Sequence, residues 1–299
     1  MVAAASERAL ARSREERTAG RHLWSPEAAE SLLQELAQRM RAPVLATGEP
    51  MVGVDLGTAY IVVVAVDEAG APLGGALRFA QVVRDGLVVD YLGAIRIVRD
   101  LVSEVEQGIG APLRTAATAY PPGIPASEAA YVRHVVESAG LDVVVAVEEP
   151  VAANAVLGIR DGALVDVGGG TTGIAIFRDG RLVHVADEPT GGTHLSLVVA
   201  GALGISFEAA EERKRDPRHQ AELLPVVRPV IEKIASIIAR HVSGRDVGTV
   251  YLVGGTCAFC GFEGVIEKSL GIPTILPSHP LLVTPLGIAL STDPEGRRG

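Results

Sequence analysis

Two stretches of the chain share one pattern of apolar and polar positions. Residues 51–66 and 163–177 each begin with an apolar run that leads to an aspartate, a glycine turn and a threonine, and each ends in a second apolar run. The pattern predicts a strand, a tight turn and a return strand, and not a strand that enters a helix. Asp55 and Asp166 hold the same place in the two units, and a repeat at so long a spacing indicates two related domains rather than a solenoid.

The remaining periodicity predicts an α/β chain. The first domain, residues 50–160, is expected to hold strands at 52–56, 61–66, 77–80, 87–89, 116–119 and 143–147, the first four as one meander, and helices at 91–107, 127–139 and 151–157. The second domain, residues 161–280, is expected to hold strands at 164–167, 174–177, 181–186, 250–253 and 273–276, and helices at 195–203, 207–214, 225–241 and 262–270. Residues 281–299 are expected to form a closing helix at 285–291, which returns to the first domain, and a polar tail.

Residues 1–49 are expected to form an N-terminal extension with one helix. Ser25 and Pro26 suit a helix start, an apolar stripe at helical spacing follows, and Pro43 marks the end. We expect this helix to pack on the core. Residues 1–22 carry five arginines against three glutamates, which fits a frayed tail; a short helix that docks on a partner is the alternative.

Composition narrows the class of protein. The chain has 299 residues, of which 48% are hydrophobic and 21% charged, enough to bury a sizeable core. A net charge of −9 argues against a general nucleic-acid surface. Apolar runs are too short to span a membrane, the N-terminus lacks the apolar core of a secretory signal, and two cysteines fit a reducing cytoplasm.

The two turns carry the residues that a nucleotide phosphate and its metal ion require. Glycines, of which 168–170 are consecutive, let backbone N–H groups approach an anion, and the threonines add hydroxyl groups. A P-loop is excluded because it needs a Lys-Ser/Thr pair and a following helix, and a dinucleotide-binding turn is disfavoured for the same topological reason. Both hairpins could instead be plain tight turns, but the acid that recurs at the same place argues against this.

The order of five motifs resembles the actin, hexokinase and DnaK-chaperone ATPase superfamily. These motifs are Asp-Leu-Gly-Thr at 55–58, Glu-Glu-Pro-Val-Ala-Ala at 148–153, Asp-Val-Gly-Gly-Gly-Thr at 166–171, Leu-Val-Gly-Gly-Thr at 252–256 and Thr-Pro-Leu-Gly-Ile-Ala at 284–289. They resemble the family's two phosphate motifs, its adenosine motif and its two connecting segments, and they span residues 51–290. The resemblance implies an actin-like ATPase (ribonuclease H-like) fold, with two related domains around a nucleotide cleft.

Segments at 82–86, 120–123, 168–176, 186–192 and 239–241 resemble more closely the ethanolamine-utilisation J family, a chaperone-like branch of this superfamily. This resemblance implies a cytoplasmic protein that binds ATP or ADP with Mg²⁺ and assists ethanolamine-utilisation enzymes or the assembly of a bacterial microcompartment. We expect no separate peptide-binding domain of the DnaK kind.

The superfamily also implies roles for single residues. Asp55 and Asp166 would hold Mg²⁺ through its water shell, and Glu149 would orient the attacking water. Phosphate donors would be Gly57, Thr58, Gly168, Gly169, Gly170, Thr171 and Thr172, with Gly191 and Gly192 beside them, and the nucleoside would contact Glu211, Lys214, Gly254, Gly255 and Thr256. Alternatively, Glu149 is only an acid at a helix N-terminus, where its charge interacts favourably with the helix dipole. Glu211 and Lys214 could likewise belong to a solvated face of their helix.

Three departures from DnaK chaperones favour nucleotide binding with slow hydrolysis, or a nucleotide-locked switch. No lysine precedes Lys214, so the catalytic lysine of those chaperones has no counterpart, and Arg84 supplies charge but different chemistry. Their acid after the second phosphate motif is Gly173 here, and their later Gly-Gly-x-Asp ends in His194, which could reach the cleft.

Two other functions stay open at this point. A small-molecule kinase of the same superfamily would need a base and a substrate pocket in the first domain, where no clear base is found. An actin-like scaffold that polymerises would be indicated by a distinct insertion or an apolar terminal helix, and neither is evident in the sequence. Cys257 and Cys260 have metal-ligand spacing, but no second pair completes a site, so we interpret them as ordinary thiols.

Overall fold

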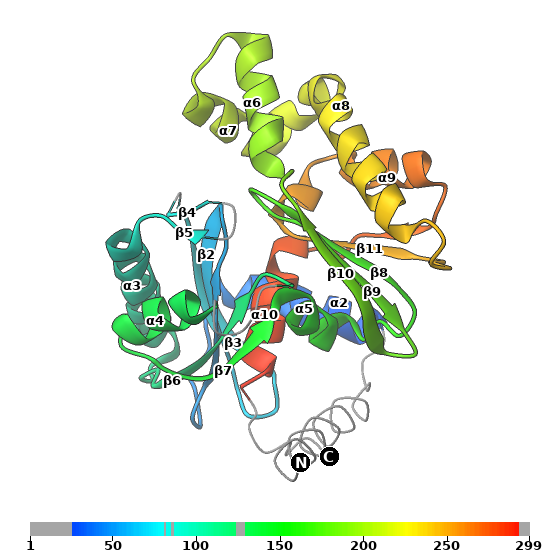
Figure 1. The fold of residues 1–299 in the computed structure, drawn as a ribbon. Coiled ribbons are helices and arrows are strands. Elements are labelled where there is room, and N and C mark those ends of the chain that lie inside the picture. Colours follow the sequence, from blue (N-terminus) through cyan, green and yellow to red (C-terminus); the bar gives the residue numbers. More distant parts are fainter. Residues whose placement is uncertain (1–25, 81, 85–86, 124–128, 293–299) are drawn as a thin grey trace, which may run out of the picture.

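Two five-stranded sheets organise the molecule (Figure 1). The computed structural model describes residues 26–80, 82–84, 87–123 and 129–292. The first sheet has the order β3-β2-β1-β6-β7 and the second β10-β9-β8-β11-β12. Their strands are β1 (Met51–Leu56), β2 (Tyr60–Val66), β3 (Pro72–Phe79), β6 (Thr115–Tyr120) and β7 (Asp142–Glu148), then β8 (Gly162–Val167), β9 (Thr172–Arg178), β10 (Arg181–Glu188), β11 (Val250–Val253) and β12 (Thr274–Ile275).

The two sheets have the same topology, which confirms the repeat predicted from the sequence. In each, three antiparallel strands are followed by two parallel ones. Asp55 pairs with Val62 across the first hairpin, and Asp166 pairs with Gly173 across the second. The two aspartates therefore occupy equivalent places near the ends of β1 and β8. The exact domain boundaries, at residues 160 and 280, stay predictions.

Helices cover the sheets and join the two halves (Figure 1). They are α2 (Pro26–Arg39), α3 (Tyr91–Ile109), α4 (Ala130–Ser138), α5 (Glu149–Leu157), α6 (Gly192–Leu203), α7 (Phe207–Arg215), α8 (Pro217–Val242), α9 (Phe262–Leu270) and α10 (Val283–Leu290), with the short 3-10 turns η1 (Gly255–Ala258) and η2 (Pro280–Leu282). No single described helix is long and apolar enough to cross a membrane; α6 and α7 meet that test only as a pair bent by 111°.

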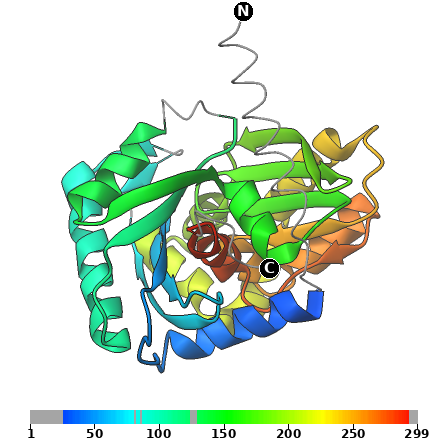
Figure 2. The same cartoon turned by 90° about the horizontal axis from the view of Figure 1, so that it is seen from below.

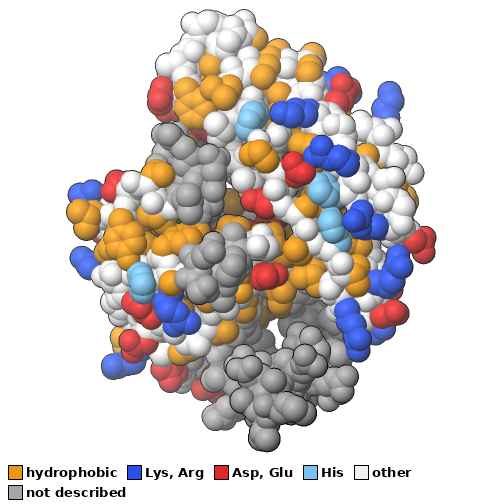
Figure 3. Space-filling model, viewed as in Figure 1, with side chains coloured by type: hydrophobic (Ala, Val, Ile, Leu, Met, Phe, Trp, Pro, Cys, Tyr) orange, Lys and Arg blue, Asp and Glu red, His pale blue; other side chains and the backbone are white. Residues whose placement is uncertain are grey.

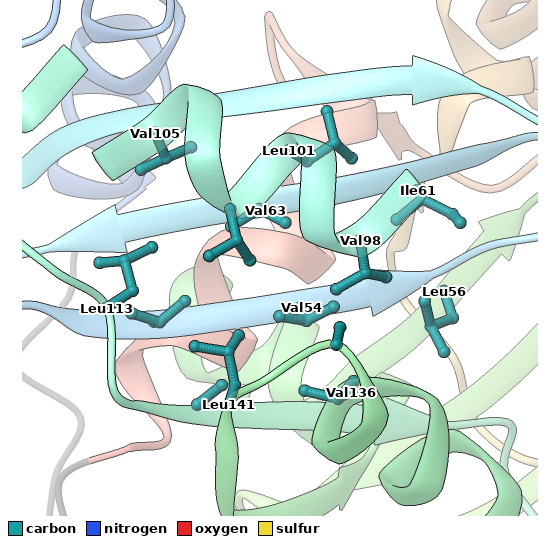
Figure 4. Close-up of a cluster of buried hydrophobic side chains, with 14 of the residues drawn as sticks. Val54, Leu56, Ile61, Val63, Val98, Leu101, Val105, Leu113, Val136 and Leu141 are labelled. Carbon is teal, nitrogen blue, oxygen red and sulfur yellow. The ribbon is translucent and has the colours of Figure 1, made fainter. Parts of the chain in front are cut away.

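The first half is held by α3, which lies on β2 and β3 and shares a core with the apolar side chains of β1 (Figure 4). Val98 and Leu101 of α3 and Val54 and Val63 of the sheet are fully buried. Removing such a side chain from water contributes about 1.5–3 kcal/mol. The Asp90 side chain caps α3 by accepting from Gly93 N at 2.8 Å. Figure 4 shows these side chains converging between the helix and the strands.

The second half is held by α8, and here the predicted helix start at Pro225 is wrong. The helix begins two turns earlier at Pro217, where the Asp216 side chain accepts from Arg218 N at 3.0 Å. Pro225 and Pro229 both lie inside it. A proline usually marks a helix start, because it lacks an N–H and breaks the interior hydrogen bonding. Here the buried apolar face of α8 continues through both prolines and overrides that local preference.

Residues 87–89 also differ from the prediction. β4 (Val83–Arg84) and β5 (Leu87–Val88) form a separate two-stranded ribbon and do not continue the first sheet. The predicted helix at 127–139 is described as α4, which begins at Ala130 with Ala129 as its N-cap; residues 127 and 128 lie outside the described ranges. The arginine-rich residues 1–22 and the tail after 292 lie outside them as well.

The base of the molecule is built from α5 and α10, which pack between the two sheets. A Cβ placed on Gly287 of α10 would lie 1.8 Å from Ala152 O of α5, and one on Gly53 of β1 would lie 2.4 Å from Ala289 N. Only glycine permits these approaches, and they seat α10 against the first half as predicted. Ala152 and Ala153 of α5 are buried in this contact region, whereas Ala155 is exposed.

Helix α2 runs along one side of the molecule and spans both halves (Figure 2). Leu33 and Leu36 are fully buried and share a core with β2 and α10. Glu30 accepts from Ser278 N, in the second half, at 3.2 Å. As predicted, the N-terminal helix packs on the core.

Basic and histidine side chains gather over the second half on the face drawn in Figure 3. Glu188, at the end of β10, accepts from Arg240 at 2.9 Å and from His241 Nε2 at 2.8 Å. His241 Nδ1 lies 3.1 Å from His184 Nε2. These contacts fix the end of β10 to α8 and so anchor the segment that leads into α6.

Candidate functional site

A cavity of about 480 Å³ lies between the two halves. This volume falls in the range of small-molecule sites. Both hairpin turns, the start of α5, helices α6 and α7 and the end of β11 line it. The predicted site residues that line it are Asp55, Gly57, Thr58, Glu149, Asp166, Gly168, Gly169, Thr171, Gly192, Glu211, Lys214, Gly254, Gly255 and Thr256.

The two hairpin turns meet at the centre of this cavity. A Cβ on Gly169 would lie 2.7 Å from Cβ of Ala59. One on Gly170 would lie 3.1 Å from Cγ2 of Thr58. The absence of side chains at both glycines therefore lets the second turn rest directly against the first. Such paired turns can enclose a phosphate chain from two sides.

The second turn is held from behind by its own half. Gly168 N donates to Thr171 O at 3.0 Å, which closes the turn. Gly168 O accepts from Thr256 Oγ1 at 2.7 Å and from Gly192 N at 2.9 Å, and Thr193 N donates to Gly169 O at 2.8 Å. The start of α6 thus braces the turn, and Thr256 supports it in addition to lining the cavity.

Three residues predicted to touch the nucleotide do not line the cavity. The Thr172 hydroxyl is fully buried and donates to Thr190 O at 2.6 Å. Gly170 packs on Thr58, and a Cβ on Gly191 would lie 2.7 Å from Gly168 O. Thr172, Gly170 and Gly191 therefore shape the turn rather than face the cavity.

Three carboxylates gather where the turns meet α5. Burial and the charge of Asp166 raise the pKa of Asp55 from 3.8 to about 7. Burial also raises the pKa of Asp166 to about 6, although a hydrogen bond from Thr284 opposes the rise. Burial raises the pKa of Glu149 well above 4.5, and both aspartates add to the effect.

The pKa of Glu149 distinguishes the two interpretations of this residue. Glu149 is the first residue of α5, where a helix dipole would favour its charged form and lower its pKa. Its pKa is instead raised, by burial first and then by the charges of Asp55, Asp166 and Asp187, and its side chain lines the cavity. Glu148, the N-cap, does not line the cavity. The arrangement therefore favours the functional interpretation of Glu149.

The donor set fits a hydrated divalent cation. No ion pair to Asp55, Glu149 or Asp166 is formed within the described ranges, so a cation would relieve their mutual repulsion. The described residues include no cluster of three His, Cys, Asp or Glu side chains that could hold a metal directly. Mg²⁺ usually keeps several of its waters and touches few carboxylates. Asp55 and Asp166 are thus the groups that could hold such an ion through water.

Glu211 and Lys214 do not belong to a solvated face. Lys214 Nζ donates to Glu211 Oε2 at 2.7 Å and to Gly192 O at 3.0 Å. Glu211 is buried, and its carboxylate also accepts from the fully buried Ser196 hydroxyl. Burial lowers the pKa of Lys214, and the charge of Glu211 opposes this. The pair forms a polar part of the cavity wall beside Gly192, where α6 begins.

Sequence reasoning missed several residues of the site. Thr284 donates to Asp166 Oδ2 at 3.1 Å, and Asp187 raises the pKa values of Asp166 and Glu149. Tyr60 and Arg215 line the mouth of the cavity. The motif at 284–289 could have indicated Thr284, whereas the others carry no local signal.

Other sequence predictions concern the edges of the site. His194 Nδ1 accepts from Gly191 N at 3.2 Å and does not line the cavity. Gly173 lines it and leaves room where DnaK chaperones have an acid. The side chain of Arg84 lies outside the described part of the chain. Cys257 is buried and Cys260 exposed, both as free thiols.

Comparison with known proteins first identifies the fold. The family model for MreB/Mbl protein matches residues 73–201, and that for cell division protein FtsA matches residues 163–287. The ADP-bound MreB5 of Spiroplasma citri has a TM-score of 0.63 at 17% identity, over 82% of this chain and 96% of that chain. These matches show the actin-like ATPase fold.

Relatives with higher sequence identity carry the name ethanolamine utilization protein EutJ. Ethanolamine utilization protein EutJ of Escherichia coli K12 is 42% identical over 261 residues, which cover 87% of this chain and 92% of the relative. The crystal structure of EutJ from Carboxydothermus hydrogenoformans has a TM-score of 0.85 at 50% identity, over 89% of this chain and 98% of that one. The chain therefore belongs to the EutJ family of ethanolamine utilization proteins, which carries the actin-like ATPase fold.

Proposed function

We propose that this protein binds ATP or ADP with Mg²⁺ between its two halves and works as a nucleotide-dependent switch in ethanolamine utilization. One observation carries the proposal: two glycine turns meet at the centre of a cavity that three half-buried carboxylates also line. Glycine turns bind phosphate through N–H groups, whereas carboxylates repel it unless a cation lies between them. Mg²⁺ would supply that charge and link acids to phosphate.

Two groups of residues on the cavity wall have different chemistry. The two turns, with Gly57, Thr58, Gly168, Gly169 and Thr171, offer N–H and hydroxyl donors for phosphate oxygens. Gly254 and Gly255 bring bare backbone to the cavity, and Gly254 lies against Asp166, because a Cβ there would be 2.3 Å from Asp166 Oδ1. Glu211 and Lys214 add a polar pair to the wall, and a nucleoside is proposed to bind beside it, because a carboxylate and an ammonium group can bind its hydroxyl groups.

Hydrolysis is proposed to be slow. Glu149 is the group placed to orient a water molecule, and phosphoryl transfer depends chiefly on positioning and on charge stabilisation. The only lysine near the cavity, among the residues that the structure describes, is Lys214, which is already bonded to Glu211 and Gly192. Among the described residues that line the cavity, no lysine without such bonds is present to stabilise charge on the transferred phosphoryl group.

The cellular role that we propose is chaperone-like assistance to ethanolamine-utilization enzymes, or to the assembly of their microcompartment, in the cytoplasm. The name of the EutJ relatives supports the pathway, and the actin-like fold supports a switch that closes its halves around a ligand. The client would bind to the surfaces of the two halves or to the N-terminal segment.

Thermal unfolding with and without nucleotide tests this proposal. ATP or ADP with Mg²⁺ should raise Tm, because a ligand that binds only the folded state stabilises it by RT ln(1 + [L]/Kd). Mg²⁺ with GTP or with ribose 5-phosphate serves as a comparison. Thr58→Ala should reduce the shift, and Thr115→Ala, whose side chain is remote from the cavity, should not. No shift for the wild-type protein at millimolar ATP would refute nucleotide binding.

A further inference from the structure

The mouth of the cavity is bridged by one basic side chain. The guanidinium carbon of Arg215, the last residue of α7, lies 4.9 Å from the ring centroid of Phe79 and 5.4 Å from that of Tyr60. The two rings meet edge to face at 5.7 Å. Tyr60 and Phe79 belong to β2 and β3 of the first half, whereas Arg215 belongs to the second. Figure 1 shows α7 reaching over the end of β2.

The charge of Arg215 is directed at the rings rather than at an acid. Among the described residues it forms no ion pair, although Glu211 lies in the same helix. The guanidinium is exposed and the two rings are half-buried, so the contact closes the rim of the cavity. Cations over aromatic faces within about 6 Å are attracted by the ring quadrupole. The contact can form only while the two halves are close.

This contact lies on the opposite side of the hairpin turns from the base that joins the two halves. The halves are joined at the base through α5 and α10, and the hairpin turns touch midway, at Gly169 and Ala59. Opening about the base would separate the mouth by more than any other level. Any opening about the base therefore breaks this contact, so its interaction free energy counts against the open state.

We propose that Arg215, Tyr60 and Phe79 form a latch that holds the two halves together at the cavity mouth and limits the rate at which a ligand enters and leaves. The kinetic part of this proposal rests on the nucleotide binding proposed above, whereas the closure itself does not. One cation–π contact at a partly exposed site shifts an equilibrium about two- to five-fold. Loss of the latch should therefore raise the open population by about that factor.

A distance measurement without nucleotide tests the closure directly. Cys260 is exposed on the second half, Cys257 is buried, and Leu92 of α3 is 71% exposed on the first half. Spin labels at Cys260 and at position 92 in Leu92→Cys would report the separation of the halves by double electron–electron resonance. Arg215→Ala and Phe79→Leu should each shift the distribution of label-to-label distances toward longer values. The double variant should show little further shift beyond either single variant. Arg215→Lys should lie between, because it keeps the charge and loses the planar stacking.

Arg218→Ala is the matched control, since Arg218 is 84% exposed at its side chain and pairs with Asp216 outside the cavity. An Arg215→Ala distribution identical to that of the wild type, or independent effects of the two substitutions, would overturn the latch. Release of a fluorescent ADP analogue, followed by stopped flow, should quicken about two- to five-fold in Arg215→Ala. If the wild type binds no ADP, nucleotide binding fails, and the distance measurement still decides the latch.

Discussion

The Thr284 hydroxyl, in the first turn of α10, donates to Asp166 Oδ2 at 3.1 Å. Helix α10 lies against β1 and α5 of the first half, so this bond links the carboxylate of the second hairpin to the base that joins both halves. It also favours the charged form of Asp166 and lowers its pKa against the effect of burial. The closing helix thus helps to set the charge of the site.

Thr284→Val should therefore change the site without changing its shape. The pKa of Asp166 should rise further above about 6, because the hydrogen bond that opposes the rise is lost. We expect a loss of about 0.5–1.5 kcal/mol in unfolding free energy, as for a typical hydrogen bond. We also expect Mg²⁺-dependent ADP binding to weaken more at pH 6 than at pH 8. Calorimetry at both pH values checks this, and an equal loss at both would contradict the assigned role.

The raised carboxylate pKa values predict a pH dependence of stability. The ordinary aspartate pKa is 3.8, whereas those of Asp55 and Asp166 are about 7 and about 6 in the folded state. The folded state holds these protons more tightly, so the stabilisation is complete below about pH 4 and is lost as the pH rises through about 6 to 7.

Asp55→Asn removes one such group and isolates its contribution. Without Mg²⁺ and nucleotide, the variant should gain stability relative to the wild type as the pH rises from about 5 to 7.5. Urea unfolding at both pH values measures the difference, and other titrating groups cancel in the comparison. A gap between the two proteins that stays constant would mean that Asp55 titrates normally.

The close packing of Gly287 against α5 predicts that a larger residue at this position destabilises the base. Gly287→Ala would place a Cβ 1.8 Å from Ala152 O and force α10 away from α5. We expect a loss of about 2–3 kcal/mol, typical of an overpacked core. Gly264→Ala is the control, because Gly264 lies in α9 with no atom near its Cβ position, and helix propensity should stabilise this variant slightly. Chemical denaturation compares the two; equal stabilities would refute close packing at Gly287.

Glu149→Gln should separate binding from chemistry. The substitution keeps size and removes charge, so ADP affinity should stay within a few-fold, while single-turnover ATP hydrolysis should fall about 100-fold or more. Glu148→Gln changes the neighbouring N-cap, which does not line the cavity, and should leave hydrolysis unchanged. Radiolabelled phosphate release measures both. Equal rates in Glu149→Gln and the wild type would remove Glu149 from the reaction.

The parts of the fold that the sequence predicts are those with a strong local pattern. Each hairpin is predicted from two apolar runs on either side of a glycine turn, with Asp55 and Asp166 at equivalent places. The start of α8 is not predicted correctly, because proline usually marks a helix start and Pro225 therefore indicates one. In the structure, the buried apolar face of α8 stabilises the helix through Pro225.

The parts of the site that the sequence does not predict depend on contacts between distant segments. Arg215 meets Tyr60 and Phe79 only after the two halves come together. Thr172 belongs to the phosphate motif by pattern, yet its hydroxyl is taken by Thr190 O. A motif thus indicates which turn carries the chemistry, whereas packing decides which side chains of that turn face the cavity.

Calorimetric titration of ADP with and without Mg²⁺ tests the central claim most directly. The wild type and Asp142→Asn, altered at an exposed carboxylate of β7, should bind ADP more tightly with Mg²⁺. Asp166→Asn should lose about ten-fold or more of the affinity with Mg²⁺ and little without it, because the carboxylate acts through the ion. Absence of binding by the wild type, or an unchanged Mg²⁺ effect in Asp166→Asn, would contradict a nucleotide held with its metal between the two hairpins.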